Sequence, residues 1–140
     1  MLLLTRAALA IIATLMLAAP VLACSCARNP TAEGLLRDSD AVFTGAVQDV
    51  RSIAPGVSIT TFVVTESFKG PAAGATVQVR HPSGSSASCG VHFETGTSYT
   101  LAVYRGSHGL AATLCSAWMF LPQVGLGPDL IARMRALRGR

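Results

Sequence analysis

Residues 57–69 read VSITTFVVTESFK, and apolar side chains recur at alternate positions along this stretch. Its even-numbered positions include Phe62, Val64 and Phe68, with Glu66 on the same side. A two-residue period of this kind is typical of a β-strand that buries one face. The stretch therefore predicts a sheet that packs one side against a hydrophobic core.

The segments around this strand carry the same period and are separated by turn residues. Pro55-Gly56 precedes the strand, and Lys69-Gly70-Pro71 follows it. The main strands are predicted over residues 40–51, 57–69, 76–81, 99–104 and 110–115, with further extended chain over 89–93. Five strands with short connections indicate a small, closed or nearly closed antiparallel barrel, of which the OB-fold is one type.

Helical patterns lie before and after the predicted strands. Asn29 is a predicted N-cap with Pro30 at the first helical position, and this short helix ends near Asp38. A second helix is predicted near the C-terminus, where apolar residues share one helical face: Leu130, Ile131, Met134 and Leu137. We therefore expect a mainly β fold with a short N-terminal helix and a C-terminal helix that packs on the barrel.

The first 23 residues have the pattern of a secretory signal peptide. Arg6 precedes an apolar run over residues 7–19, which is too short to span a bilayer, and residues 21–23 end in alanine as signal peptidase requires. We expect a secreted, extracellular or periplasmic protein that begins at Cys24 and has no transmembrane span. In a competing interpretation, residues 21–24 resemble a bacterial lipobox, and a lipid anchors Cys24 to a membrane surface.

Length and composition fit a single globular domain behind the signal peptide. The chain has 140 residues, of which 51% are hydrophobic and 13% charged, so a disordered protein is excluded. We divide it into a signal peptide over 1–23, a β domain over 24–123 and a helical tail over 124–140. The net charge of +4 comes largely from the tail arginines: Arg133, Arg135, Arg138 and Arg140. We interpret them as a solvated helix face and expect a monomer without a nucleic-acid partner.

The four cysteines, Cys24, Cys26, Cys89 and Cys115, all follow the predicted signal peptide. An even number in an oxidising compartment indicates disulfides. A bond between Cys24 and Cys26 would close a strained ring, so each is expected to pair with either Cys89 or Cys115, and both arrangements remain open. The competing interpretation is a Cys-x-Cys metal or redox site, for which no histidine lies at ligand spacing.

Catalytic motifs are missing from the sequence. It contains no Gly-x-Ser-x-Gly, no His-Glu-x-x-His and no phosphate-binding glycine loop. Cys115-Ser116 and the histidines His81, His92 and His108 are interpreted as a disulfide residue and polar residues rather than as a nucleophile with its base. We therefore expect a protein that is not an enzyme and has no cofactor.

Several short motifs occur in a fixed order along residues 24–121. They are Cys24-Ser25-Cys26, Ser39-Asp40-Ala41-Val42-Phe43, Phe68-Lys69-Gly70, Ser88-Cys89-Gly90, Gly109-Leu110 and Cys115-Ser116. In these motifs the chain resembles the inhibitory N-terminal domain of the tissue inhibitors of metalloproteinases, which belongs to the netrin-like OB-fold group. The resemblance implies the pairing Cys24–Cys89 and Cys26–Cys115. The third disulfide of that family has no counterpart here.

The resemblance also implies that the protein inhibits a zinc metalloprotease. In that family the α-amino nitrogen and carbonyl oxygen of the first cysteine, here Cys24, chelate the catalytic zinc of the protease and displace its water. Ser25 would enter the specificity pocket beside that zinc. A second contact ridge would consist of Ser86, Ala87, Ser88, Cys89 and Gly90. The alternative function is a secreted or lipid-anchored OB-fold binding module without inhibitory activity.

Overall fold

The computed structural model describes residues 24–139, so the predicted signal peptide and Arg140 lie outside the described residues. The strands are β1 (Ala41–Ala54), β2 (Val57–Lys69), β3 (Thr76–Pro82), β4 (Ser98–Gly106) and β5 (Gly109–Ala111). The helices are α2 (Ala32–Asp38), α3 (Leu114–Ala117) and α4 (Gly127–Arg138), with short 3-10 turns η1 (Ser86–Ser88) and η2 (Trp118–Phe120). The mainly β class with an N-terminal and a C-terminal helix is therefore confirmed.

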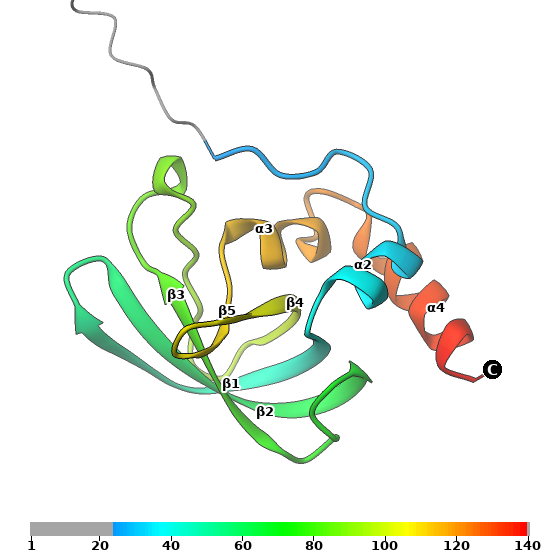
Figure 1. Ribbon diagram of the computed structural model, residues 1–140, viewed down its shortest axis with the longest axis horizontal. Helices are drawn as coiled ribbons and strands as arrows, with labels where there is room; N and C mark the ends of the chain where they lie inside the picture. The colour runs from blue at the N-terminus through cyan, green and yellow to red at the C-terminus, as the bar shows by residue number, and fades with distance from the viewer. Residues whose placement is uncertain (1–23, 140) are drawn as a thin grey trace, which may run out of the picture.

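The five strands pair in the order β1-β2-β3-β5-β4, and β4 returns to β1, so the sheet closes into a barrel (Figure 1). The expectation of a purely antiparallel sheet is wrong, because β3 and β5 run parallel, with Val79 opposite Leu110 and Arg80 opposite Ala111. The reason is topological. Strand direction cannot alternate all the way around a closed ring with an odd number of strands, so at least one neighbouring pair must be parallel.

The barrel interior is filled by side chains that are at most 6% exposed: Phe43, Val47, Phe62, Val64, Val79, Val91, Phe93, Leu101 and Val103. The Phe62 ring lies edge-on to the rings of Phe43 and Phe93, with centroids 5.9 and 5.2 Å apart. Such edge-to-face pairs add to the stability that apolar burial gives. The two-residue period predicted for β2 thus places Phe62 and Val64 in this core.

A second core lies between the sheet and the two longer helices, which pack side by side in Figure 1. Val42 and Met134 are fully buried there, together with Phe68 at the end of β2. β1 therefore begins with apolar residues on both faces, because Phe43 points into the barrel while Val42 packs in the helix-covered core.

The N-terminal helix begins two residues later than predicted. The backbone of Thr31 is extended, and its Oγ1 accepts a hydrogen bond from the amide of Gly34 at 3.1 Å, so Thr31 rather than Asn29 is the N-cap. Two of the predicted extended segments also take another form. Residues 89–93 join no ladder, and the last predicted strand stops at Ala111, because Thr113 caps α3.

Three of the tail arginines, Arg133, Arg135 and Arg138, bind the body of the protein instead of forming a purely solvated face. Arg135 donates two hydrogen bonds to the Glu66 carboxylate at 2.8 and 2.9 Å, which lowers the pKa of Glu66. Arg133 donates to Glu33 of α2, and Arg138 donates to the Ser67 carbonyl oxygen. α4 is thereby held against the sheet. No helix within residues 24–139 has the length and apolar character needed to cross a membrane.

Candidate functional site

Two disulfides fasten the segment at the start of the described chain to the body of the protein. Cys24 is bonded to Cys89 and Cys26 to Cys115, with Cα atoms 5.1 and 5.2 Å apart, and this pairing is the one that the resemblance implies. In Figure 1 the segment crosses the top of the molecule above α3. Each bond closes a long stretch of chain, with partners 65 and 89 positions apart, which greatly restricts the unfolded chain.

Cys115 is held in place by the capping of the short helix α3. The Thr113 hydroxyl accepts a hydrogen bond from the Cys115 amide at 3.2 Å, and the Ser116 hydroxyl accepts one from the Thr113 amide at 3.1 Å. This reciprocal arrangement is a capping box. The Leu114 amide also donates to the Cys89 carbonyl oxygen at 2.9 Å, so the cysteines that receive the two disulfides lie side by side.

The segment that contains Cys89 forms an exposed ridge beside the Cys24–Cys89 disulfide. Ser86, Ala87 and Ser88 make up η1 and are all exposed, whereas Cys89 is half-buried and Gly90 is buried. Cys89 has a left-handed backbone with φ of 60°, which turns the chain back toward the barrel. Gly90 follows and packs closely against Gly84, whose backbone would overlap any added Cβ, so only glycine fits.

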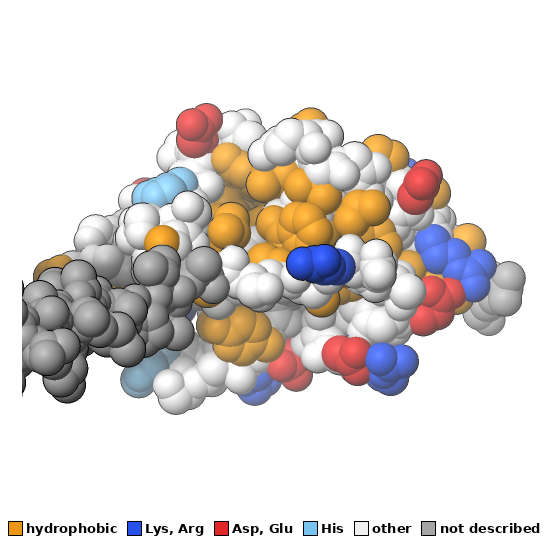
Figure 2. Space-filling model, turned by 90° about the horizontal axis from the view of Figure 1, so that it is seen from above, with side chains coloured by type: hydrophobic (Ala, Val, Ile, Leu, Met, Phe, Trp, Pro, Cys, Tyr) orange, Lys and Arg blue, Asp and Glu red, His pale blue; other side chains and the backbone are white. Residues whose placement is uncertain are grey.

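Ser25 is exposed and lines a surface depression of about 350 Å³, which we call the N-terminal depression. Its lining residues are Cys24, Ser25, Cys26, Arg28, Leu114 and Trp118. The Trp118 indole nitrogen is buried and has no hydrogen-bond partner among the described residues. Figure 2 views the molecule from this side and shows apolar side chains gathered over the middle of the face. The site therefore combines a tethered backbone with an apolar surface.

Three sulfurs at this site have the spacing of a metal-binding group. Those of Cys24, Cys26 and Cys115 lie within 4.8 Å of one another, and no other such cluster of His, Cys, Asp or Glu occurs within residues 24–139. All three sulfurs belong to disulfides, whereas a cysteine binds a metal ion as a free thiolate. In this oxidised state the disulfide interpretation of the Cys-x-Cys motif therefore holds in place of the metal-site interpretation.

The histidines and Ser116 are not brought together as catalytic partners. His81 is buried in the barrel, His92 contacts the Gly84 carbonyl oxygen at 3.2 Å, and His108 is exposed in the turn between β4 and β5. The Ser116 hydroxyl is occupied in the α3 cap, and Cys115 is in a disulfide. Neither is free to act as a nucleophile.

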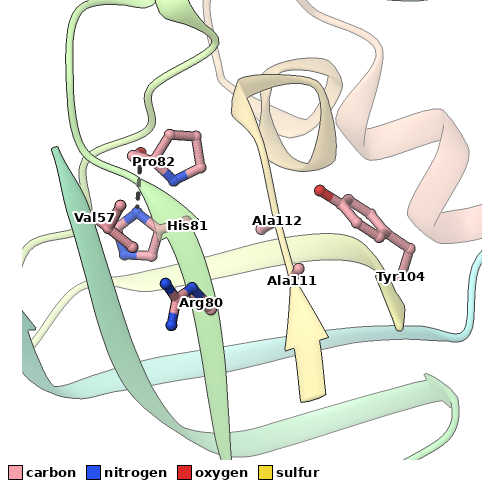
Figure 3. Close-up of a pocket in the computed structure, with 7 residues that line it drawn as sticks. All are labelled: Val57, Arg80, His81, Pro82, Tyr104, Ala111 and Ala112. Carbon is pink, nitrogen blue, oxygen red and sulfur yellow. Dashed lines mark hydrogen bonds between the residues drawn. The ribbon is translucent and has the colours of Figure 1, made fainter. Parts of the chain in front are cut away.

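A second depression, of about 240 Å³, lies across β3 and β5, and we call it the β3–β5 groove. Its lining residues are Val57, Arg80, His81, Pro82, Tyr104, Ala111 and Ala112. Figure 3 shows Arg80 and Tyr104 on opposite sides, with the two alanines between them. The Arg80 side chain has no hydrogen bond or ion pair with any described residue.

The sequence analysis did not identify the β3–β5 groove. Arg80 and Tyr104 each occupy an outward position in an alternating strand, which sequence can reveal. β5 lies between their strands, and Ala111 of β5 is opposite Arg80 on one side and opposite Tyr104 on the other. Only this arrangement brings the two residues to one groove. That position of β5 is part of the parallel pairing that the predicted antiparallel sheet did not include.

No family model matches this chain, and no curated protein matches it either.

Proposed function

We propose that this protein is an exported inhibitor of zinc metalloproteases that uses the backbone of Cys24 as its zinc ligand. The fold class supports this proposal, because a small five-stranded barrel is the architecture of the OB-fold to which netrin-like domains belong. Two of the motifs that carry the resemblance also have structural roles here. Gly70 lies against Ala41, for example, and Lys69 donates hydrogen bonds to the carbonyl oxygens of Leu36 and Ser39.

The chemistry begins with removal of residues 1–23, which frees the α-amino group of Cys24. An α-amino group has a pKa of about 7.7–8.0, so it gives up its proton readily to a metal near neutral pH. Its nitrogen and the Cys24 carbonyl oxygen close a five-membered chelate ring on the zinc of the protease. The water that this zinc would activate for peptide hydrolysis is displaced, and the protease is inactive while the complex lasts.

The observation that carries the proposal is the Cys24–Cys89 disulfide next to exposed Ser25 and the exposed ridge of Ser86–Ser88. The bond fixes the backbone that would chelate, so little conformational entropy is lost on docking. It also places two exposed segments side by side, where both can contact one protease cleft. Ser25 would enter the specificity pocket, and its small side chain suits pockets of many sizes.

The test compares three forms of the processed protein against a panel of zinc proteases. They are the protein that begins at Cys24, the same protein with one alanine added before Cys24, and the protein with an acetylated α-amino group. Both changes convert the α-amino nitrogen of Cys24 into an amide nitrogen that cannot bind zinc in this way, so inhibition should be lost while the circular dichroism spectrum and both disulfides stay unchanged. An alanine added after Arg140 is the matched control and should leave inhibition intact. Equal inhibition by the blocked and unblocked forms would exclude the chelate mechanism.

An alternative function is that of an exported or lipid-anchored binding module, which the β3–β5 groove favours. The groove offers the Arg80 guanidinium, which has no partner within residues 24–139, and the exposed ring of Tyr104 to a ligand that carries a negative charge. Mass spectrometry of the processed N-terminus separates the two functions. A free Cys24 amine with an intact Cys24–Cys89 bond permits inhibition. A diacylglyceryl thioether at Cys24 with an acylated amine would replace that bond, remove the chelator and leave the binding module.

A further inference from the structure

The outer half of β1 has a strand on only one of its edges. β4 pairs with β1 from Ala41 to Ala46 and goes no further, whereas β2 stays beside β1 as far as Ala54. No described residue forms a ladder on the other edge of residues 48–54, all of which are exposed. In Figure 1 this part of the β1–β2 hairpin projects away from the helices. An edge of this kind leaves backbone donors and acceptors open to another strand.

The side chains along this edge are self-complementary. Asp49, Val50 and Arg51 lie in a regular part of the ladder, opposite Thr61, Thr60 and Ile59 of β2. Asp49 and Arg51 point to the same face of the sheet, since they are two residues apart. Neither side chain has a hydrogen bond or ion pair with any described residue. Val50 points to the opposite face and is 37% exposed, which is high for a large apolar residue in a strand.

We propose that a second copy of this chain pairs with the β1 edge in an antiparallel ladder whose two-fold axis passes through Val50. This arrangement goes beyond the proposed inhibitory function and replaces the monomer expected from the sequence. Asp49 of one copy then lies opposite Arg51 of the other. Symmetry repeats the Asp49–Arg51 contact, so each dimer has two interchain ion pairs. The Val50 side chains of the two copies meet at the axis and are buried there.

Charge complementarity favours a second copy over simple protection of the edge. Charged side chains on an edge strand prevent two sheets from pairing edge to edge when they bring like charges together. Here an antiparallel partner of the same sequence brings opposite charges together, because the acid and the base flank Val50 symmetrically. The regular stretch from Asp49 to Arg51, with irregular register on either side at residues 48 and 53, gives a short ladder with directly opposed ion pairs on one face. Such a small interface corresponds to a weak, concentration-dependent dimer rather than an obligate one.

The first measurement is sedimentation equilibrium on the purified protein that begins at Cys24, with both disulfides formed. The average mass should rise from that of one chain toward that of two over about 10 μM to 1 mM. Asp49→Arg gives an edge with two bases, and Arg51→Asp gives an edge with two acids. Each variant alone should dissociate about tenfold or more readily, since symmetry places every like-charge contact in the dimer twice. Asp129→Arg, an equal change of charge on an exposed residue of α4, should dimerise like the unchanged protein.

Mixing the two variants is the decisive experiment. The edge with two bases, from Asp49→Arg, complements the edge with two acids, from Arg51→Asp, so the mixture should form a heterodimer although neither variant associates alone. This result cannot come from damage to one variant. Unchanged spectra and intact disulfides in both variants complete the control. A single-chain mass for the unaltered protein at about 1 mM, dimerisation that ignores both reversals, or a mixture that stays monomeric would each overturn the proposal.

Discussion

Thr60 and His81 form a buried hydrogen bond inside the barrel, with 2.8 Å between Oγ1 and Nε2. The other ring nitrogen, Nδ1, lies 3.2 Å from the Pro82 carbonyl oxygen, which can only accept a hydrogen bond (Figure 3). Nδ1 therefore donates, and Nε2 accepts from the Thr60 hydroxyl. Both nitrogens of a neutral imidazole are thus satisfied. Burial disfavours the charged form and lowers the pKa of His81 below its ordinary value of 6.5.

The lowered pKa makes stability depend on pH in a known direction. Below about pH 6.5, His81 becomes protonated in the unfolded chain but stays neutral in the folded protein until a lower pH. The free energy of unfolding should therefore fall as the pH drops. The slope contributed by one such group is at most about 1.4 kcal/mol per pH unit. Urea unfolding between about pH 5 and pH 7.5 measures it. His81→Gln should be less stable overall but should lose this slope, and an equal slope in both proteins would show that another group titrates.

Replacing Gly70 with alanine should destabilise the protein more than the same change at Gly74. Both glycines have positive φ, 92° and 86°, so alanine is strained at either place. At Gly70 the new Cβ would also lie 2.9 Å from the Cβ of Ala41, whereas nothing lies within 4 Å at Gly74. We expect a loss of about 1 kcal/mol for Gly74→Ala and about 2–4 kcal/mol for Gly70→Ala in urea unfolding. Equal losses would mean that the close approach to Ala41 relaxes without cost.

The attachment of α4 should depend on Met134 far more than on Arg135. The Met134 side chain is fully buried, so Met134→Ala leaves a cavity and should cost about 2–5 kcal/mol. Arg135 has an exposed side chain, and solvent screens its ion pair with Glu66, so Arg135→Ala should cost at most about 1 kcal/mol. Thermal unfolding of the two variants gives the comparison. A larger loss for Arg135→Ala would show that the ion pair, not the apolar face, holds the helix.

Loss of the Cys26–Cys115 disulfide should separate stability from inhibition. The double change Cys26→Ser with Cys115→Ser should lower the free energy of unfolding by about 2–5 kcal/mol, because the unfolded chain gains freedom. The Cys24–Cys89 bond remains and still fastens the proposed zinc ligand. The variant should therefore keep measurable inhibition at temperatures where it is folded. Complete loss of inhibition in a folded variant would mean that both bonds are needed to position Cys24.

Ser25→Gly tests the proposed specificity contact. It removes the exposed side chain that would enter the protease pocket, so inhibition should weaken by about 1–3 kcal/mol where that pocket fits serine best and less elsewhere. Inhibition constants across several zinc proteases measure the pattern. Thr31→Gly, a change on the exposed N-cap of α2, is a control that should not alter the ranking of the proteases. A uniform effect, or none, would remove Ser25 from the contact.

The sequence by itself determined most of the strands and restricted the cysteine pairing. The two-residue period of residues 57–69 sufficed to predict β2, because alternation follows directly from strand geometry. The positions of the four cysteines likewise limited the pairing to two arrangements. Local signals were weaker at element ends. Asn29 and Thr31 are both suitable N-cap residues, and Thr31 caps α2 because its side chain accepts a hydrogen bond from the Gly34 amide.

Only the tertiary structure decided which strands are neighbours and in which direction they run. The parallel pairing of β3 with β5 follows from closing a ring of five strands, a constraint that no single segment carries. The same closure brings Arg80 and Tyr104 to one groove and leaves one edge of the outer half of β1 without a paired strand among the described residues. Long-range pairing depends on how all strands pack together, whereas the period of a strand depends on its own residues.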